Sequence, residues 1–224
     1  MKHKLNWRQL QMCSAARALD MDARLHWEQV YATKGREQVS WFRPHLERSV
    51  ELIERAAPDR LASIVDVGAG QSTLVDDLLG LGYEDLTVLE ISRAAIDASK
   101  ERVGRSRSKV QWICADVTEV ELPETSFDLW HDRAVFHFLV EACQRRAYVE
   151  RVKRVLKPGG SLIVSTFGPS GPESCSGLAT MRYDAAALGS EFGDRFRLME
   201  RSLELHKTPS GAVQQFLSCW YQLS

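Results

Sequence analysis

Short apolar runs alternate with amphipathic stretches through the middle of the chain. The apolar runs are rich in β-branched residues, which is typical of strands. The stretches between them repeat apolar residues three and four positions apart, as amphipathic helices do. This alternation predicts parallel βαβ units, and hence an α/β fold with a doubly wound, mostly parallel sheet. The expected strands cover 61–68, 86–91, 110–116, 127–132 and 161–167, and the expected helices cover 71–82, 92–104 and 141–156.

The two ends of the chain depart from this alternation. Residues 24–57 repeat apolar positions at helical spacing, and Pro58 with Asp59 predicts where that helix ends. Near the C-terminus, the extended segments 196–206 and 213–222 flank a Thr-Pro-Ser-Gly-Ala turn, which predicts an antiparallel hairpin. A hairpin added to a parallel sheet narrows the range of possible folds.

Three parts are therefore expected: an extension over residues 1–20, a helical lid over 21–58 and the α/β domain over 59–224. The extension is basic and has no acidic residue before Asp20. That composition fits either a transit peptide or a short surface extension before a second possible start at Met21. We favour the surface extension.

Composition and charge exclude several classes of protein. Hydrophobic residues make up 44% of the 224 positions, so the chain can form a core and is not of disordered or collagen-like composition. The net charge is −1, from 29 basic and 30 acidic residues, so no overall positive field attracts nucleic acid. The basic stretches 100–109 and 145–157 have helical spacing, which favours solvated outer faces.

Cysteine spacing and hydropathy limit the partners further. The five cysteines are scattered and form no CxxC pair, which argues against a zinc site and a disulfide framework. No apolar run approaches the roughly 20 residues that span a membrane. We expect no metal, no nucleic-acid partner, no membrane partner and a reducing, cytoplasmic location.

The sequence VDVGAG, residues 65–70, places a candidate binding loop at the end of the first expected strand. Asp66 lies near the strand end, and Gly68 and Gly70 flank Ala69 in the turn that follows. Glycines let the backbone approach a ligand closely, and the N-terminus of the next helix offers free N–H groups. Alone, the pattern fits a buried tight turn equally well.

Further polar positions lie at neighbouring strand ends. Glu90, followed by Ile91, ends the second strand, where a carboxylate can accept hydrogen bonds from two ribose hydroxyls. Asp116, followed by Val117, comes after the third strand, where a carboxylate can hold an exocyclic amine. Ligands of open α/β sheets bind beyond the carboxyl ends of the strands. The glycine loop, Glu90 and Asp116 all lie at such ends, and together they favour a nucleotide-like ligand.

The segments SIVDVGAG, VLEIS, ICADV and LKPGGSLIVSTF, in this order, resemble the class I S-adenosylmethionine-dependent methyltransferases over residues 60–222. The resemblance implies a seven-stranded, Rossmann-like sheet with a C-terminal antiparallel hairpin. It also implies S-adenosylmethionine as cofactor and S-adenosylhomocysteine as product. One departure is Ser72, which stands where the family often has a third glycine and can still cap the helix.

The same resemblance assigns roles to the candidate residues. The backbone of Gly68 to Gly70 faces the methionine part, and Asp66 faces its amino group or a bridging water. Glu90 binds the ribose hydroxyls, and Asp116 with Val117 contacts the adenine. A lid with Trp27, Tyr31 and Trp41 lies over the sulfonium, whose charge an aromatic face attracts. Packing of a helix against the core is the alternative role for each of these three rings.

A nicotinamide-dependent dehydrogenase is the rival for a glycine loop after a strand. Its GxGxxG fingerprint needs glycine at position 73, where this chain has Thr73. The chain also shows no second nucleotide-binding half. The methyltransferase interpretation is therefore preferred.

Candidate acid–base residues follow the fourth strand in LWHDRAVFHF, residues 129–138. Asp132 can remove a proton from the acceptor or orient an amine, and His131 is the alternative base. The structural alternative is an ion pair between Asp132 and Arg133, with His131 capping the next helix. The segment looks like the W-D-R-G-A-L element of thiopurine methyltransferase-like enzymes, which favours a small-molecule acceptor.

The loop over residues 168–184 is long and rich in Gly, Pro and Ser, as lids often are. It supplies four candidate acceptor contacts, Cys175, Ser176, Arg182 and Tyr183. We predict a methyltransferase, monomeric or dimeric, for a small molecule methylated at sulfur, nitrogen or oxygen. A protein lysine methyltransferase and a cofactor-binding sensor without turnover are the alternatives.

Overall fold

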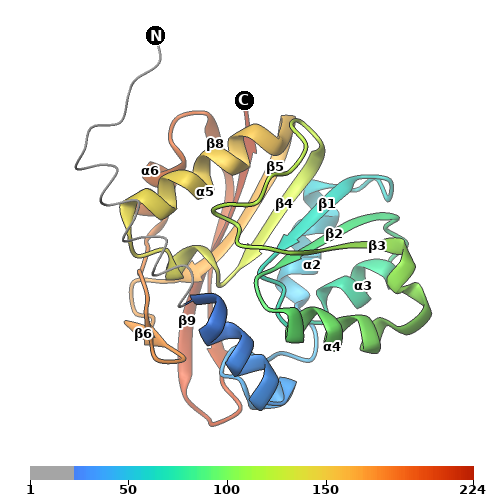
Figure 1. Ribbon diagram of the computed structural model, residues 1–224. Helices are drawn as coiled ribbons and strands as arrows, with labels where there is room; N and C mark the ends of the chain where they lie inside the picture. Colours follow the sequence, from blue (N-terminus) through green and yellow to red (C-terminus); the bar gives the residue numbers. More distant parts are fainter. Residues whose placement is uncertain (1–22) are drawn as a thin grey trace, which may run out of the picture.

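The computed structural model describes residues 23–224, and the predicted extension over residues 1–20 lies outside the described residues. A seven-stranded sheet with the order β3-β2-β1-β4-β5-β9-β8 forms the centre (Figure 1). Its strands are β1 Ser63–Val67, β2 Asp85–Glu90, β3 Val110–Cys114, β4 Phe127–Arg133, β5 Leu156–Phe167, β8 Phe196–Lys207 and β9 Val213–Leu223. The pairs among β1 to β5 are parallel, whereas β9 is antiparallel to both β5 and β8. The predicted fold class, including the C-terminal hairpin, is confirmed.

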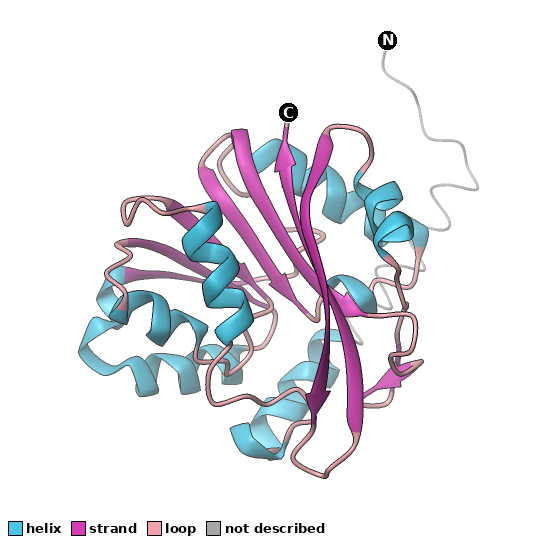
Figure 2. Ribbon diagram, turned by 180° about the vertical axis from the view of Figure 1, so that it is seen from behind, coloured by secondary structure: helices cyan, strands magenta, loops and turns pink. Residues whose placement is uncertain are grey.

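Helices cover both faces of the sheet, as the views from the two sides show (Figures 1 and 2). They are α2 Glu47–Ala56, α3 Leu74–Gly80, α4 Arg93–Val103, α5 Ala142–Val155 and α6 Ala185–Phe192. Ser92 caps α4 and Asp184 caps α6, each accepting a hydrogen bond from a backbone N–H of the first turn. Short 3₁₀ helices lie at η1 Arg36–Gln38, η2 Gly104–Lys109 and η3 Phe136–Phe138.

Alternation along the strands divides the core into two layers. In β4, Leu129 packs with α2 and α3 on one face, and Trp130 packs with α5 on the other. Ile163 and Leu162 of β5 divide in the same way. The side chain of a residue in β4 is thus directed to a helical layer by its position in the strand, which matters for His131 and Asp132 below.

The N-terminal part differs from the single helix expected over residues 24–57. Residues 23–33 are helical, residues 34–46 form a connection that contains η1, and α2 then begins at Glu47. Gly35 and Pro44 lie in this connection. The two helices therefore have different neighbours: α2 packs on the sheet, and the helix over 23–33 lies across the carboxyl ends of the strands (Figure 1).

Beyond β5, the loop predicted over 168–184 contains a small antiparallel pair, β6 Ser174–Cys175 and β7 Leu178–Ala179. Like the helix over 23–33, it lies near the carboxyl ends of the parallel strands (Figure 1). Within residues 23–224, no helix is long and apolar enough to cross a membrane. The first strand-end loops, the N-terminal helix and this loop together enclose the site.

Candidate functional site

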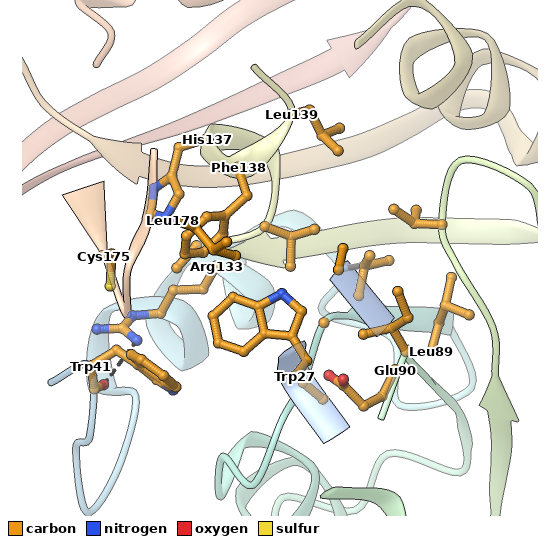
Figure 3. A pocket seen from close by; sticks show the side chains of 18 of the residues that line it. Trp27, Trp41, Leu89, Glu90, Arg133, His137, Phe138, Leu139, Cys175 and Leu178 are labelled. Carbon is orange, nitrogen blue, oxygen red and sulfur yellow. Dashed lines mark hydrogen bonds between the residues drawn. The ribbon is translucent and has the colours of Figure 1, made fainter. Parts of the chain in front are cut away.

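A cavity of about 520 Å³ lies at the carboxyl ends of β1, β2 and β4, which is within the usual size of small-molecule sites. Most of the predicted site residues line it: Trp27, Tyr31, Trp41, Asp66, Gly68, Ala69, Glu90, Ile91, Asp116, Val117 and His131. Gly70 and Asp132 do not. Figure 3 shows Trp27 in the middle of the cavity, with Glu90 and Leu89 on one side and Arg133, His137 and Cys175 on the other.

Both glycines of the loop have the left-handed backbone that favours glycine, with φ of +61° at Gly68 and +53° at Gly70. A Cβ at position 68 would overlap the side chain of Val135, and one at position 70 would overlap the hydroxyl of Tyr31. The close approach that requires glycine is therefore made by the protein itself. Val135 follows β4 and Tyr31 belongs to the N-terminal helix, so the glycine loop is the surface on which both segments close.

Glu90 links the glycine loop to the start of α4. One carboxylate oxygen accepts a hydrogen bond from the Gly70 N–H at 2.8 Å, and the other accepts one from the Ser92 N–H at 2.9 Å. The side chain is almost completely buried, and this burial raises its pKa to about 7. Each carboxylate oxygen has further lone pairs, so the group can still accept hydrogen bonds from a ligand.

Asp66 lines the cavity and has one carboxylate oxygen without a hydrogen-bond partner within residues 23–224. Its Oδ1 lies 2.7 Å from Nδ1 of His131, and Nε2 of His131 lies 2.9 Å from the hydroxyl of Ser49 in α2. The Oδ2 atom of Asp66 is buried and has no hydrogen-bond partner within residues 23–224. A buried carboxylate oxygen without a partner fits the ammonium group of the methionine part of the cofactor.

Asp116 is partly buried and bends the chain after β3. Its Oδ1 accepts hydrogen bonds from the backbone N–H and the hydroxyl of Thr118, both at 2.7 Å. These bonds do not use the second carboxylate oxygen. Asp116 and the buried Val117 beside it both line the cavity.

The N-terminal helix is attached to the domain at several points. Trp27 lies 5.1 Å from the ring of Phe138 and 5.6 Å from that of Trp41, both edge to face. Glu28 accepts hydrogen bonds from the Ser92 hydroxyl at 2.7 Å and from the Ala94 N–H at 3.2 Å, at the N-terminus of α4. With Tyr31 on the glycine loop, these contacts form a lid across the cavity.

The two proposed acid–base residues are placed differently from what the sequence analysis expected. Asp132 is fully buried on the α5 face, where it accepts hydrogen bonds from the backbone N–H groups of Val135 and Phe136 and from the Tyr148 hydroxyl. It forms no ion pair with Arg133, whose Nη1 donates instead to the Trp41 carbonyl. Burial raises the pKa of Asp132 to about 6.

Through these bonds Asp132 holds the turn into η3, and its side chain is not part of the cavity lining. His131 borders the cavity, but both of its ring nitrogens are engaged by Asp66 and Ser49. It connects α2 to the cofactor side, and it does not cap a following helix. A role of either residue in proton transfer stays a prediction that the hydrogen bonds do not favour.

Of the four loop residues expected at the acceptor, only Cys175 lines the cavity. Burial raises the pKa of its thiol, so the sulfur is not an activated nucleophile. Arg182 pairs with Glu173 on the loop surface, and Tyr183 is buried against Phe136. Ser176 is not part of the cavity lining.

Sequence reasoning missed several lining residues at the end opposite Glu90. Arg133, His137, Phe138 and Phe216 all belong to this set. The first three lie in the segment that the sequence singled out, although the acid–base roles there were given to Asp132 and His131 and Arg133 was considered only as an ion-pair partner. Phe216 comes from β9, and no motif identifies it, because only the antiparallel pairing of β9 with β5 brings it beside Phe167.

Comparisons with known proteins find methyltransferases. A family described as a methyltransferase domain matches residues 65–164. The chain is 25% identical over 138 residues to an eEF1A lysine and N-terminal methyltransferase of Bos taurus, covering 62% of this chain and 19% of that protein. It is 31% identical over 130 residues to a malonyl-[acyl-carrier protein] O-methyltransferase of a Paenibacillus species, covering 55% of this chain and 46% of that protein. The chain thus spans less than half the length of either relative.

A solved structure shares the fold. The N-methyltransferase NodS of Bradyrhizobium japonicum, in complex with S-adenosyl-l-homocysteine, matches with a TM-score of 0.67 and 17% identity, over 88% of this chain and 98% of that one. Residues 65–164 thus match a methyltransferase domain, and the chain has the Rossmann-like fold of the class I methyltransferases, whose cofactor is S-adenosylmethionine.

Proposed function

We propose that this chain is an S-adenosylmethionine-dependent methyltransferase that methylates a small molecule at sulfur, nitrogen or oxygen. The observation that carries the proposal is a single cavity that joins the glycine loop and Glu90 to an enclosed, aromatic-lined end. That end is bordered by Trp41, Phe138 and Phe216. It offers a small molecule a place beside the cofactor and little room for a folded protein surface.

The cofactor supplies a methyl group already activated by its sulfonium, so the protein mainly aligns the acceptor and excludes water. Asp66 would hold the ammonium group, Glu90 the ribose hydroxyls and Asp116 the adenine. The aromatic rings of Trp27, Tyr31 and Trp41 would surround the sulfonium, whose positive charge their faces attract. Their contacts with one another show that they also pack the lid.

We infer that Asp132 and His131 position the site and do not transfer protons. Asp132 holds the Val135–Phe136 backbone, which closes on Gly68, and His131 holds Asp66. In this view the acceptor attacks as a neutral or already ionised nucleophile. Loss of the Asp132 carboxylate would then lower both stability and activity, and would leave no separate pH dependence of turnover.

A protein lysine methyltransferase is the second candidate, because the relative from Bos taurus is described as a lysine and N-terminal methyltransferase. That relative is matched over 19% of its length, and the cavity end beyond Trp27 presents no carboxylate for a lysine within residues 23–224. A sensor without turnover is the third. It would use the same cofactor contacts.

The test has two steps. Calorimetry with S-adenosylhomocysteine should show binding, and Glu90→Ala should weaken it through the loss of the ribose contacts. The protein is then incubated with methyl-labelled cofactor and a fractionated cell extract. Label in small molecules supports the proposal, label in protein supports the second candidate, and binding without any transfer supports the sensor.

A further inference from the structure

The aromatic-lined end of the cavity, opposite Glu90, is called the acceptor end here. Two side chains at this end each have a buried hydrogen-bond donor without a partner. The donors are Nη2 of Arg133 and Nε2 of His137, and neither is bonded to any group within residues 23–224. Figure 3 shows both side chains on the same side of Trp27, away from Glu90 and near Cys175. Buried donors without partners are rare in folded proteins, because a group removed from water loses its hydrogen bonds.

Arg133 presents a positive charge that pairs with no carboxylate within residues 23–224. Its Nη1 donates to the Trp41 carbonyl at 3.2 Å, and the guanidinium lies 4.9 Å from the centre of the Phe216 ring. The acidic group whose charge acts on it, Glu204, lies beyond ion-pair distance and is paired with Arg43 at 3.7 Å. Burial lowers the pKa of Arg133 to about 10, so the group is still a cation at neutral pH.

His137 is a neutral donor and not a base. It is fully buried and stacked on Phe167 at 4.2 Å, and its Nδ1 accepts a hydrogen bond from the Phe167 N–H at 3.1 Å. The proton must therefore sit on Nε2, the nitrogen without a partner. Burial, and then the charge of Arg133, lowers the pKa of His137 to about 3, so the ring stays neutral.

The two donors define the chemistry of a ligand. Together they offer two N–H groups and one positive charge, and the aromatic walls of Trp41, Phe167 and Phe216 surround them. A carboxylate has two oxygens in a plane, one for each donor, and a charge that matches the guanidinium. A lysine ammonium would instead meet a like charge and two donors, and so it is disfavoured.

We propose that Arg133 and His137 form an anion-binding subsite, and that the methyl acceptor is a small molecule with a carboxylate on a flat, apolar body. This inference rests on the proposed function, because it takes the opposite end of the cavity to be the cofactor site. The carboxylate is bound by direct donation from Nη2 of Arg133 and Nε2 of His137.

The test measures binding of benzoate and phenylacetate to the full chain saturated with S-adenosylhomocysteine, with benzamide and phenylacetamide as uncharged counterparts. The carboxylates should bind at least about tenfold more tightly than the amides, which is the usual range for hydrogen bonds to a charged group. Arg133→Met should remove that preference. Arg182→Met, which deletes an exposed arginine outside the cavity, should leave it unchanged.

His137→Phe provides an independent variant. It keeps a ring for stacking on Phe167 and removes the Nε2 donor, together with the Nδ1 acceptor of the Phe167 N–H. It should weaken carboxylate binding by about tenfold, while the affinity for S-adenosylhomocysteine is retained. In buffer without carboxylates, Arg133→Met should also melt at a higher temperature than the wild type, because a charge that no carboxylate within residues 23–224 pairs with has been removed from the cavity wall.

Equal binding of carboxylates and amides, no carboxylate binding to the wild type, or unchanged preference in both variants would overturn the subsite. The affinity for S-adenosylhomocysteine is measured first and separately. If the homocysteine derivative does not bind, the proposed function fails; the carboxylate comparison is then made on the chain alone and still decides the subsite.

Discussion

At the scale of single residues, the glycine loop is shaped by contacts within the protein. Gly70 has a left-handed backbone, and a side chain there would collide with Tyr31 of the lid. Gly82 shares the left-handed backbone, with φ of +89°, but a side chain there would meet no atom within 4 Å. Substitutions at Gly70 and Gly82 can therefore separate the energetic cost of a left-handed backbone from that of a collision with Tyr31.

Gly82→Ala should therefore lose about 1–2 kcal/mol in the free energy of unfolding, and Gly70→Ala should lose at least as much. Only Gly70→Ala should also displace Tyr31 and weaken binding of S-adenosylhomocysteine, because the lid can no longer close on the loop. Denaturant unfolding and calorimetry measure the two quantities. Equal cofactor affinity in both variants would show that the lid tolerates a side chain at position 70.

The carboxyl of Glu90 should make stability depend on pH. Burial raises its pKa from 4.5 to about 7 in the folded protein, so the folded state holds the proton more tightly than the unfolded state. The corresponding stability is complete below about pH 4.5 and is lost as the pH rises through 7. The full difference corresponds to about 3 kcal/mol.

Glu90→Gln cannot ionise, so its stability relative to the wild type should rise between pH 5 and pH 8. Urea unfolding at one-unit intervals measures this trend, and the exposed residue Glu84, changed to Gln, is the control. A constant difference between Glu90→Gln and the wild type over that range would contradict a raised pKa at position 90.

At the scale of elements, the helix over residues 23–33 is attached to the N-terminus of α4 through Glu28. Ser92 still caps α4 through the Ala95 N–H when Glu28 is absent, so α4 should keep its structure. Glu28→Ala should thus loosen the lid selectively, at a cost of about 1 kcal/mol. The exposed Glu37, changed to Ala, is a control within the same N-terminal region.

Hydrogen exchange measures the effect directly. Amides of residues 23–33 should exchange faster in Glu28→Ala than in the wild type, whereas amides of α4 should not change. Faster exchange in α4 as well would mean that Glu28 is part of the cap of that helix and not a separate attachment of the lid.

The parallel strands and their helices were predictable because each strand is a short apolar run bounded by glycine, proline or an acid. The break between the two N-terminal helices was not recognised, although Gly35 and Pro44 mark it. In β4, the sequence identified the right segment but could not assign the faces. His131 and Asp132 alternate toward α2 and α5, and only the packed structure shows that these helices supply Ser49 and Tyr148 as partners.

At the scale of the whole molecule, the cofactor side of the site was predictable and the acceptor side was not. The cofactor side consists of strand-end residues whose spacing follows from the βα repeat. The acceptor side combines the end of β4, the loop after β5 and Phe216 of β9 with the N-terminal helix. These segments are far apart in sequence and share no motif, so only the tertiary structure brings the loop after β5, Phe216 and the N-terminal helix around Arg133 and His137.

We expect the lid described above to limit the rate at which product is released. Tyr31 lies on the glycine loop and Glu28 is bonded to the start of α4, so a homocysteine product bound beneath the lid would leave only after these contacts break. Opening of such segments sets the turnover of many enzymes. Once an acceptor is known, the first turnover should be faster than later ones, and kcat should fall as sucrose raises the solvent viscosity. Glu28→Ala should reduce both effects, so that the enzyme with the weaker lid releases its product sooner.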